Sequence, residues 1–191
     1  MTSDQHDQAT IGQPTGSRPA ALATQLRWVH DMLRRDLITI QQLAVRVSDG
    51  ALAAEVEREL HNLQTNGPLF QLRVNCLSYC QTLESHHRNE DAILFPAVRR
   101  AAPQLAATVD RLEADHLIVA SLLTEIDEFA QDLDDTSTRQ ALVDALDDLS
   151  SNLLRHLDLE ETTLQPILES WSSWPDDAPA EIRDEVARRG T

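Results

Sequence analysis

Two copies of one short pattern contain the residues best suited to metal chemistry. The first reads HHRNEDAILFPAV from His86, and the second reads HLDLEETTLQPIL from His156, seventy residues later. Each copy has His-x-x-x-Glu, an acidic residue directly after the Glu, and Leu and Pro at matching positions. Residues i and i+4 of a helix lie on one face. His86 with Glu90, and His156 with Glu160, are therefore predicted to bind metal as pairs.

The apolar pattern around these pairs places them on the core side of their helices. Apolar residues recur around each pair at alternating steps of four and three, which is the spacing of a core-facing helix seam. His30 and His116 each interrupt a further seam of this kind. At 1.5 Å per residue, all four His lie roughly 20 to 30 Å from the predicted turns. Antiparallel packing would bring six polar side chains into one layer: His30, His86, Glu90, His116, His156 and Glu160.

Six buried polar side chains in one layer need partners. Each would cost roughly 2 kcal/mol or more if unpaired, and together they would approach the roughly 5 to 15 kcal/mol stability of a domain. A metal-free hydrogen-bond network is possible, but the two-fold repetition and the common depth favour metal. The four imidazoles argue against Ca²⁺ and Mg²⁺, and the lack of Cys argues against structural zinc. Mixed His and carboxylate ligands suit iron, manganese or catalytic zinc.

The number of ligands predicts two metal ions. Six side chains are too many for one mononuclear site with an open position. Glu90 and Glu160 would bridge two metals, and the four imidazoles would divide two to each. This arrangement leaves coordination positions free for an oxo or hydroxo bridge and for a small ligand such as O₂, peroxide or NO.

Four long helices are expected to position these residues. Five Gly, 4% aromatic residues and abundant Leu, Ala, Glu, Asp and Arg favour helix over sheet, so we predict an all-α fold. Pro96 should bend or locally open the second helix, because it lacks an N–H and frees the carbonyl four residues back. The long helices are predicted at residues 20–48, 69–100, 104–133 and 139–171.

The remaining segments complete the predicted domain organisation. The bundle domain spans residues 20–171, with a short extra helix at 51–65 between the first and second long helices. Residues 1–19 are polar and rich in Gly and Pro, which predicts a disordered N-terminal tail. Residues 172–191 form a C-terminal tail with room for one short helix.

Composition excludes several classes of partner. The formal charge of −16 argues against a nucleic-acid or anionic-membrane surface. The sequence has no stretch of eighteen apolar residues and no basic-then-apolar start, so we expect a cytoplasmic protein. Cys76 and Cys80 are four apart on one predicted helix, which suits buried free thiols better than a disulfide.

Two neighbours of the predicted ligands have alternative interpretations. His87 follows a ligand directly, about 100° around the helix. A surface His paired with Asp91 is favoured over a second-shell or alternative ligand role. Tyr79 occupies the seam position that Leu149 fills in the other copy. A core ring with its hydroxyl on a backbone group is favoured there, and a second-shell contact to a bound oxygen species is the alternative.

The order His, His-x-x-x-Glu, His, His-x-x-x-Glu, with EDAILFP after the first pair, closely resembles the hemerythrin-like (HHE cation-binding) domain family. The resemblance covers about residues 20–171. It implies an up-down four-helix bundle with a non-haem di-iron centre, in which the four His are terminal ligands and the two Glu are bridges. Members of the family bind or sense O₂, sense iron, or handle peroxide or nitric oxide.

The resemblance leaves more than one function open. The oxygen carriers of invertebrates have five His and a longer last motif ending in Asp, whereas this chain has four His and two Glu in these motifs. An extra open or water-filled position would favour redox turnover or sensing over oxygen storage. We expect a di-iron protein that binds or reacts with O₂, peroxide or NO, with an unknown protein partner. The alternatives are a di-iron enzyme that decomposes hydrogen peroxide and a metal-stabilised structural bundle.

Overall fold

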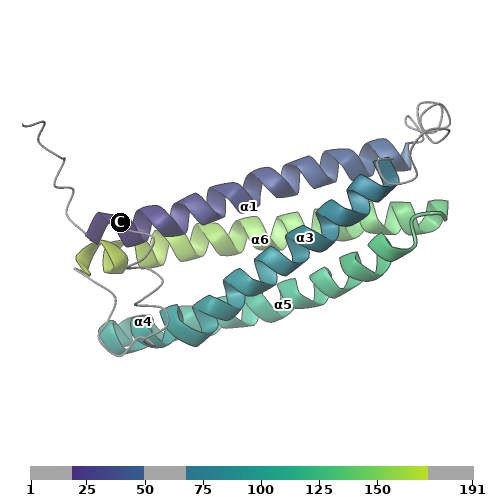
Figure 1. The fold of residues 1–191 in the computed structure, drawn as a ribbon. Coiled ribbons are helices and arrows are strands. Elements are labelled where there is room, and N and C mark those ends of the chain that lie inside the picture. The colour runs from purple at the N-terminus through teal and green to yellow at the C-terminus, as the bar shows by residue number, and fades with distance from the viewer. Residues whose placement is uncertain (1–18, 50–67, 172–191) are drawn as a thin grey trace, which may run out of the picture.

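The computed structural model describes residues 19–49 and 68–171, and nearly all of these residues are helical, which confirms the all-α fold. Four long helices run up and down along one axis (Figure 1). They are α1 (Pro19–Ser48), α3 (Pro68–Asn89), α5 (Ala106–Gln131) and α6 (Thr136–Ser170), with the shorter α4 (Phe95–Ala101) following α3. The predicted bundle helices are therefore present, with ends within a few residues of the predicted ones.

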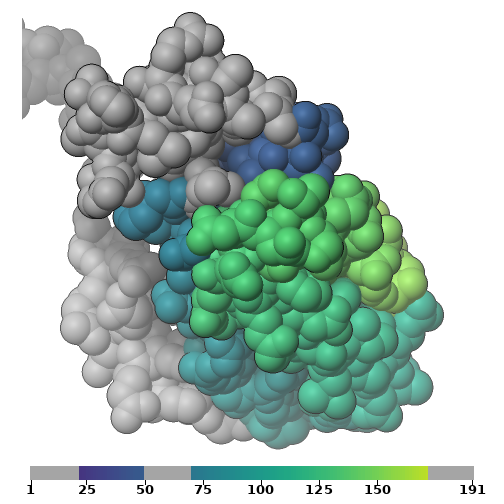
Figure 2. Space-filling model, turned by 90° about the vertical axis from the view of Figure 1, so that its right-hand side faces the viewer, coloured from purple at the N-terminus to yellow at the C-terminus, as the bar shows by residue number. Residues whose placement is uncertain are grey.

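Each long helix packs against two others, so the bundle closes into a ring. The packed pairs are α1 with α6, α6 with α5, α5 with α3, and α3 with α1. Figure 2 looks along the bundle at the end where α5 passes into α6, and shows their green surface beside the blue end of α1. Every helix therefore turns one face towards a shared interior.

The ends of α5 and α6 follow from local chemistry. Pro103 opens the short 3₁₀ turn Pro103–Leu105 that leads into α5. Asp135 precedes α6 as its N-cap, and its carboxylate accepts hydrogen bonds from the backbone N–H groups of Ser137 and Thr138. These bonds satisfy donors that have no partner within the helix. The predicted turn is thus fixed by one of the capping residues within it.

The second long helix is interrupted beside Pro96. Residues Glu90–Leu94 form a π-helical turn between α3 and α4, in which the Phe95 N–H donates to the Glu90 carbonyl. The expected local opening at Pro96 is therefore present, and it ends two residues before the proline. The matching Pro166 lies inside α6 without an interruption.

Two apolar clusters enclose the polar residues. Along each long helix, with α3 continued through the π-turn into α4, the predicted ligands lie between residues of the larger cluster and residues of the smaller one. The smaller cluster lies at the α4 end and contains Ala23, Leu94, Phe95, Val98, Val109, Leu112, Leu164 and Leu168. The larger one fills the rest of the bundle with residues such as Leu37, Leu83, Ile126 and Leu149. Apolar side chains thus separate the polar layer from both ends of the bundle.

Some expectations fall outside the described residues. These are the short helix at 51–65, the C-terminal tail at 172–191, and the disordered tail at 1–19 except for Pro19, which begins α1. Across the described ranges 19–49 and 68–171, no helix is long and apolar enough to cross a membrane.

Candidate metal centre

The structure brings the six predicted residues together in the polar layer. The Nε2 atoms of His30 and His86 are 3.1 Å apart, and those of His116 and His156 are 3.2 Å apart. Two imidazoles bound to one first-row metal at about 2.1 Å and 90° would place their nitrogens about 3.0 Å apart. Each pair is therefore spaced as two ligands of one ion. The pairing joins α1 to α3 and α5 to α6.

The Glu90 carboxylate reaches both imidazole pairs. Its Oε1 atom is 3.0 Å from His86 Nε2, and its Oε2 atom is 3.4 Å from His116 Nε2. Glu160 is also placed between the pairs, because its Oε2 atom is 3.3 Å from His30 Nε2 and 3.8 Å from His156 Nε2. The two carboxylates thus occupy the space between two pairs of nitrogen ligands.

The two carboxylates are buried without the partners that buried charge requires. Glu90 and Glu160 are 3% and 0% exposed. None of their four oxygens makes a hydrogen bond, although imidazole nitrogens lie close by. Leaving such a group unsatisfied costs about 1 to 3 kcal/mol, and more when it is charged. Close nitrogen–oxygen approach without hydrogen-bond geometry is the arrangement of two ligands around one cation, so these residues fit a metal ion.

The acid after each Glu holds the imidazole of the opposite helix pair. Glu161 Oε1 is 2.8 Å from His30 Nδ1, and Asp91 Oδ1 is 2.8 Å from His116 Nδ1. An Nδ1–H that donates to a carboxylate leaves the lone pair on Nε2, the atom that faces the centre. Arg34 donates to Glu161 at 2.7 Å and fixes that carboxylate in turn.

Sequence reasoning missed this role, although the signal was present. The acid after the Glu appears in both copies of the motif. A spacing argument alone could not show which helix each acid faces. A third acid, Asp115, lies 4.0 Å from His156 Nδ1, and neither atom has a hydrogen bond.

His87 lies in the interior, which corrects the prediction that it is a surface residue paired with Asp91. It is 5% exposed, and its ring stacks on that of His116 with centroids 3.8 Å apart. Asp91 is unavailable to it, because that carboxylate contacts His116. The repeat offset gives the physical reason: His87 corresponds to Leu157, which is fully buried. This position of the motif belongs to the core face in both copies.

Tyr79 and the two cysteines belong to the apolar interior. The Tyr79 hydroxyl donates to the Leu33 carbonyl at 3.3 Å, as the favoured interpretation predicted. It therefore gives no support to a contact with a ligand of the centre. Cys76 and Cys80 are free and buried, as predicted. Burial raises the pKa of each thiol to about 12, which keeps both protonated near neutral pH.

The electrostatics of the layer attract positive charge. Burial disfavours a charged His30 ring, but the nearby negative carboxylates of Glu160 and Glu90 outweigh it and raise the His30 pKa to about 10. Burial, and next to it the charge of Glu90, raise the pKa of Glu160 to about 7. Burial and the neighbouring His116 lower the pKa of His156 to about 3, so that ring is neutral. Burial opposes ionisation of Glu90, but the neighbouring imidazoles, His86 first, hold its pKa well below the usual range. Glu90 therefore carries the negative charge that attracts a cation, while the neutral His156 ring offers a lone pair.

The potential ligand atoms fall into two groups of four. Within each group one atom per side chain lies within 4.8 Å of the others. Glu90 belongs to both groups, whereas Glu160, the other predicted bridge, belongs to the first group alone. The first contains His30, His86, Glu90 and Glu160, and the second contains His87, Glu90, His116 and His156. The geometry accommodates two cations that share one carboxylate.

Fold and site together define a helical-bundle protein with a buried cation site made of His and Glu. The model of the family described as hemerythrin HHE cation binding domain matches residues 21–168. The chain belongs to this family. Searches of curated proteins and of solved structures found no similar chain.

Proposed function

We propose that this protein holds a non-haem di-iron centre that binds or reacts with O₂, peroxide or NO. In the proposed centre the first metal position lies at His30, His86 and Glu160, and the second lies at His116 and His156. The Glu90 carboxylate would serve both positions, since it lies within reach of both imidazole pairs. Membership of a cation-binding family and the buried cluster of His and Glu support metal binding, and the mixed donor set supports iron.

The observation that carries the proposal is the pair of buried carboxylates between two imidazole pairs. Glu90 and Glu160 present four oxygens without hydrogen bonds, within reach of the Nε2 atoms. Imidazoles that satisfied these oxygens by hydrogen bonding would have made the layer complete without metal. Two cations would give all of these oxygen and nitrogen lone pairs a partner at once.

The residues of this chain set the conditions at the centre. Glu161 and Asp91 hold the His30 and His116 rings with Nε2 turned inward. The smaller apolar cluster closes one side of the layer, with Phe95 stacked on His116 at a centroid distance of 5.3 Å. A dry, fixed set of donors limits access to small ligands. When bound, the iron ions would supply open coordination positions and redox chemistry.

The described residues support ligand binding better than rapid peroxide turnover. Tyr79 was the sequence's candidate for contacting a bound oxygen species, and its hydroxyl donates to the Leu33 carbonyl instead. A stable complex with a small ligand is therefore the expected behaviour.

The direct test is to record optical spectra of the iron-loaded protein before and after adding O₂, peroxide or NO. We expect absorption changes that saturate at one small ligand per pair of irons. Spectra that stay unchanged with all three ligands would overturn the proposal. Continuous release of O₂ from peroxide at an unchanged iron content would instead favour the enzymatic alternative.

A further inference from the structure

The buried imidazole of His87 lies in the polar layer, and the six-ligand centre leaves it unused. The side chain is 5% exposed, and its Nε2 atom has no hydrogen-bond partner. A buried ring nitrogen that makes no hydrogen bond costs free energy, because it has lost its contact with water. Leu157, at the equivalent place in the second copy, fills the same kind of space with an apolar side chain.

The His87 ring lies against the imidazoles of the second proposed metal position. His87 stacks on His116 and lies edge-on to His156, with centroids 5.2 Å apart. It therefore contacts both imidazoles of the second metal position. One of its nitrogens also lies within 4.8 Å of ligand atoms of Glu90, His116 and His156.

We propose that His87 is a ligand of the second metal position, where it joins His116 and His156. The inference rests on the proposed di-metal function. It makes the two positions chemically unequal. The first has two imidazoles and two carboxylates, and the second has three imidazoles and the shared Glu90 carboxylate. The position with more carboxylate suits a harder, more highly charged ion, and the imidazole-rich position suits a softer one.

The adjacency of His86 and His87 explains how one helix serves both metals. Neighbouring residues point about 100° apart around a helix. His86 faces His30 of α1, whereas His87 faces His116 of α5. Helix α3 packs between these two helices. Consecutive imidazoles can therefore bind different ions while Glu90, one turn on, reaches both.

The test is an equilibrium titration of the metal-free protein with Co²⁺, in the wild type and in His87→Leu. Leu is the residue of the second copy, so the variant should fold. We expect two Co²⁺ per wild-type chain. In His87→Leu one site should keep its affinity, and the other should weaken by more than the roughly 10- to 100-fold typical of losing an outer-shell partner. The His86→Leu variant is the matched control, which should weaken the first position instead.

Two further measurements separate a ligand from a structural residue. Free imidazole should restore the weakened site in His87→Ala, because it can replace a missing ligand. The metal-free His87→Leu variant should resist urea at least as well as the metal-free wild type, because it loses an unpaired polar group. A structural His would give the opposite result, a lower urea midpoint.

The outcomes distinguish the two proposals. Fewer than two Co²⁺ bound by the wild type would overturn the di-metal function itself. Two Co²⁺ with unchanged affinities in His87→Leu would overturn only the assignment of His87. Loss of both sites in His87→Ala without recovery in imidazole would also overturn it.

Discussion

The two His-x-x-x-Glu motifs have the same spacing but different backbones. In the first copy the α-helix widens into a π-turn that begins at the second ligand, Glu90, whereas in the second copy α6 stays α-helical past Pro166. A π-turn adds a residue and rotates everything that follows it. Phe95 is consequently fully buried against His116. Its counterpart Gln165 is only half-buried and contacts Arg27 and Glu169 at the surface.

The repeated spacing therefore positions the ligands, while the neighbouring residues determine which side chains surround each imidazole pair. The first copy brings His87 and Phe95 inward next to the second imidazole pair. The second copy places Leu157 and an ordinary helical turn at the same points. A nearly symmetric set of ligands therefore lies in unequal surroundings.

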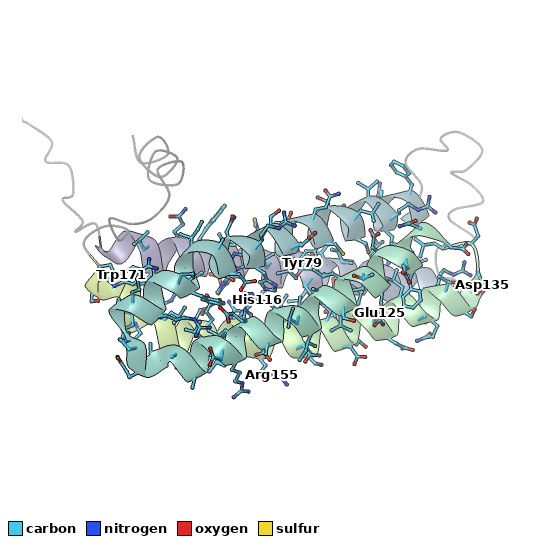
Figure 3. The ribbon with its side chains drawn as sticks, turned by 90° about the horizontal axis from the view of Figure 1, so that it is seen from below. Tyr79, His116, Glu125, Asp135, Arg155 and Trp171 are labelled. Carbon is cyan, nitrogen blue, oxygen red and sulfur yellow. The ribbon has the colours of Figure 1, made fainter. Side chains whose placement is uncertain are left out.

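The largest expected effect is on metal content, from replacing the two carboxylates one at a time. Glu90→Ala should bind well under one metal per chain, because Glu90 belongs to both groups of ligands. Glu160→Ala should keep about one, because Glu160 belongs to the first group alone. Elemental analysis of the purified variants checks this, with exposed Glu125 (Figure 3) replaced by Ala as the control. Equal metal content in the two variants would contradict the unequal roles.

The second effect is on stability, at the residue that the π-turn brings inward. Phe95→Ala should lower the free energy of unfolding by about 3 to 5 kcal/mol, because it leaves a large cavity in the smaller apolar cluster. Gln165→Ala should change it by about 0.5 kcal/mol or less, as surface substitutions do. Urea denaturation of the metal-free proteins measures both. Similar losses in the two variants would show that the rotation of Phe95 by the π-turn does not matter for stability.

A smaller effect is expected from the outer carboxylates. Glu161→Gln and Asp91→Asn each remove the charge that holds an imidazole, so each should weaken metal binding by about 10- to 100-fold. Glu161 should matter more, because its side chain is 21% exposed against 46% for Asp91, and because Arg34 fixes it. Competition with a chelator of known affinity gives the order. A larger loss in Asp91→Asn would reverse this comparison.

The smallest effect is expected at Tyr79, which lies about two helical turns before His86 on α3. Tyr79→Phe should lower the free energy of unfolding by about 0.5 to 1.5 kcal/mol, the usual contribution of one hydrogen bond. Metal content and the response to peroxide should stay at wild-type values. Altered peroxide reactivity with normal metal content would instead show that Tyr79 contacts the oxygen species bound at the centre.

The fold and the meeting of the six side chains could be predicted because both depend on periodicity. Figure 3 shows His116 between the helices and Arg155 pointing away from them, as their spacing implies. The environment of His87 could not be predicted from the first copy alone, because its neighbours come from α5 and α6. The second copy held the signal, since its Leu157 marks that position as core. The contacts of Asp91 with His116 and of Glu161 with His30 depend on how the helices are rotated about their axes, and sequence spacing does not fix that rotation.

The most direct test of the di-metal account is the metal content of protein produced in iron-replete cells, measured with its thermal midpoint before and after chelation. We predict two irons per chain and a midpoint that falls on chelation, since a ligand at 1,000 times its Kd stabilises a fold by about 4 kcal/mol. Less than one metal per chain, with an unchanged midpoint after chelation, would show that the polar layer satisfies itself and would contradict the account.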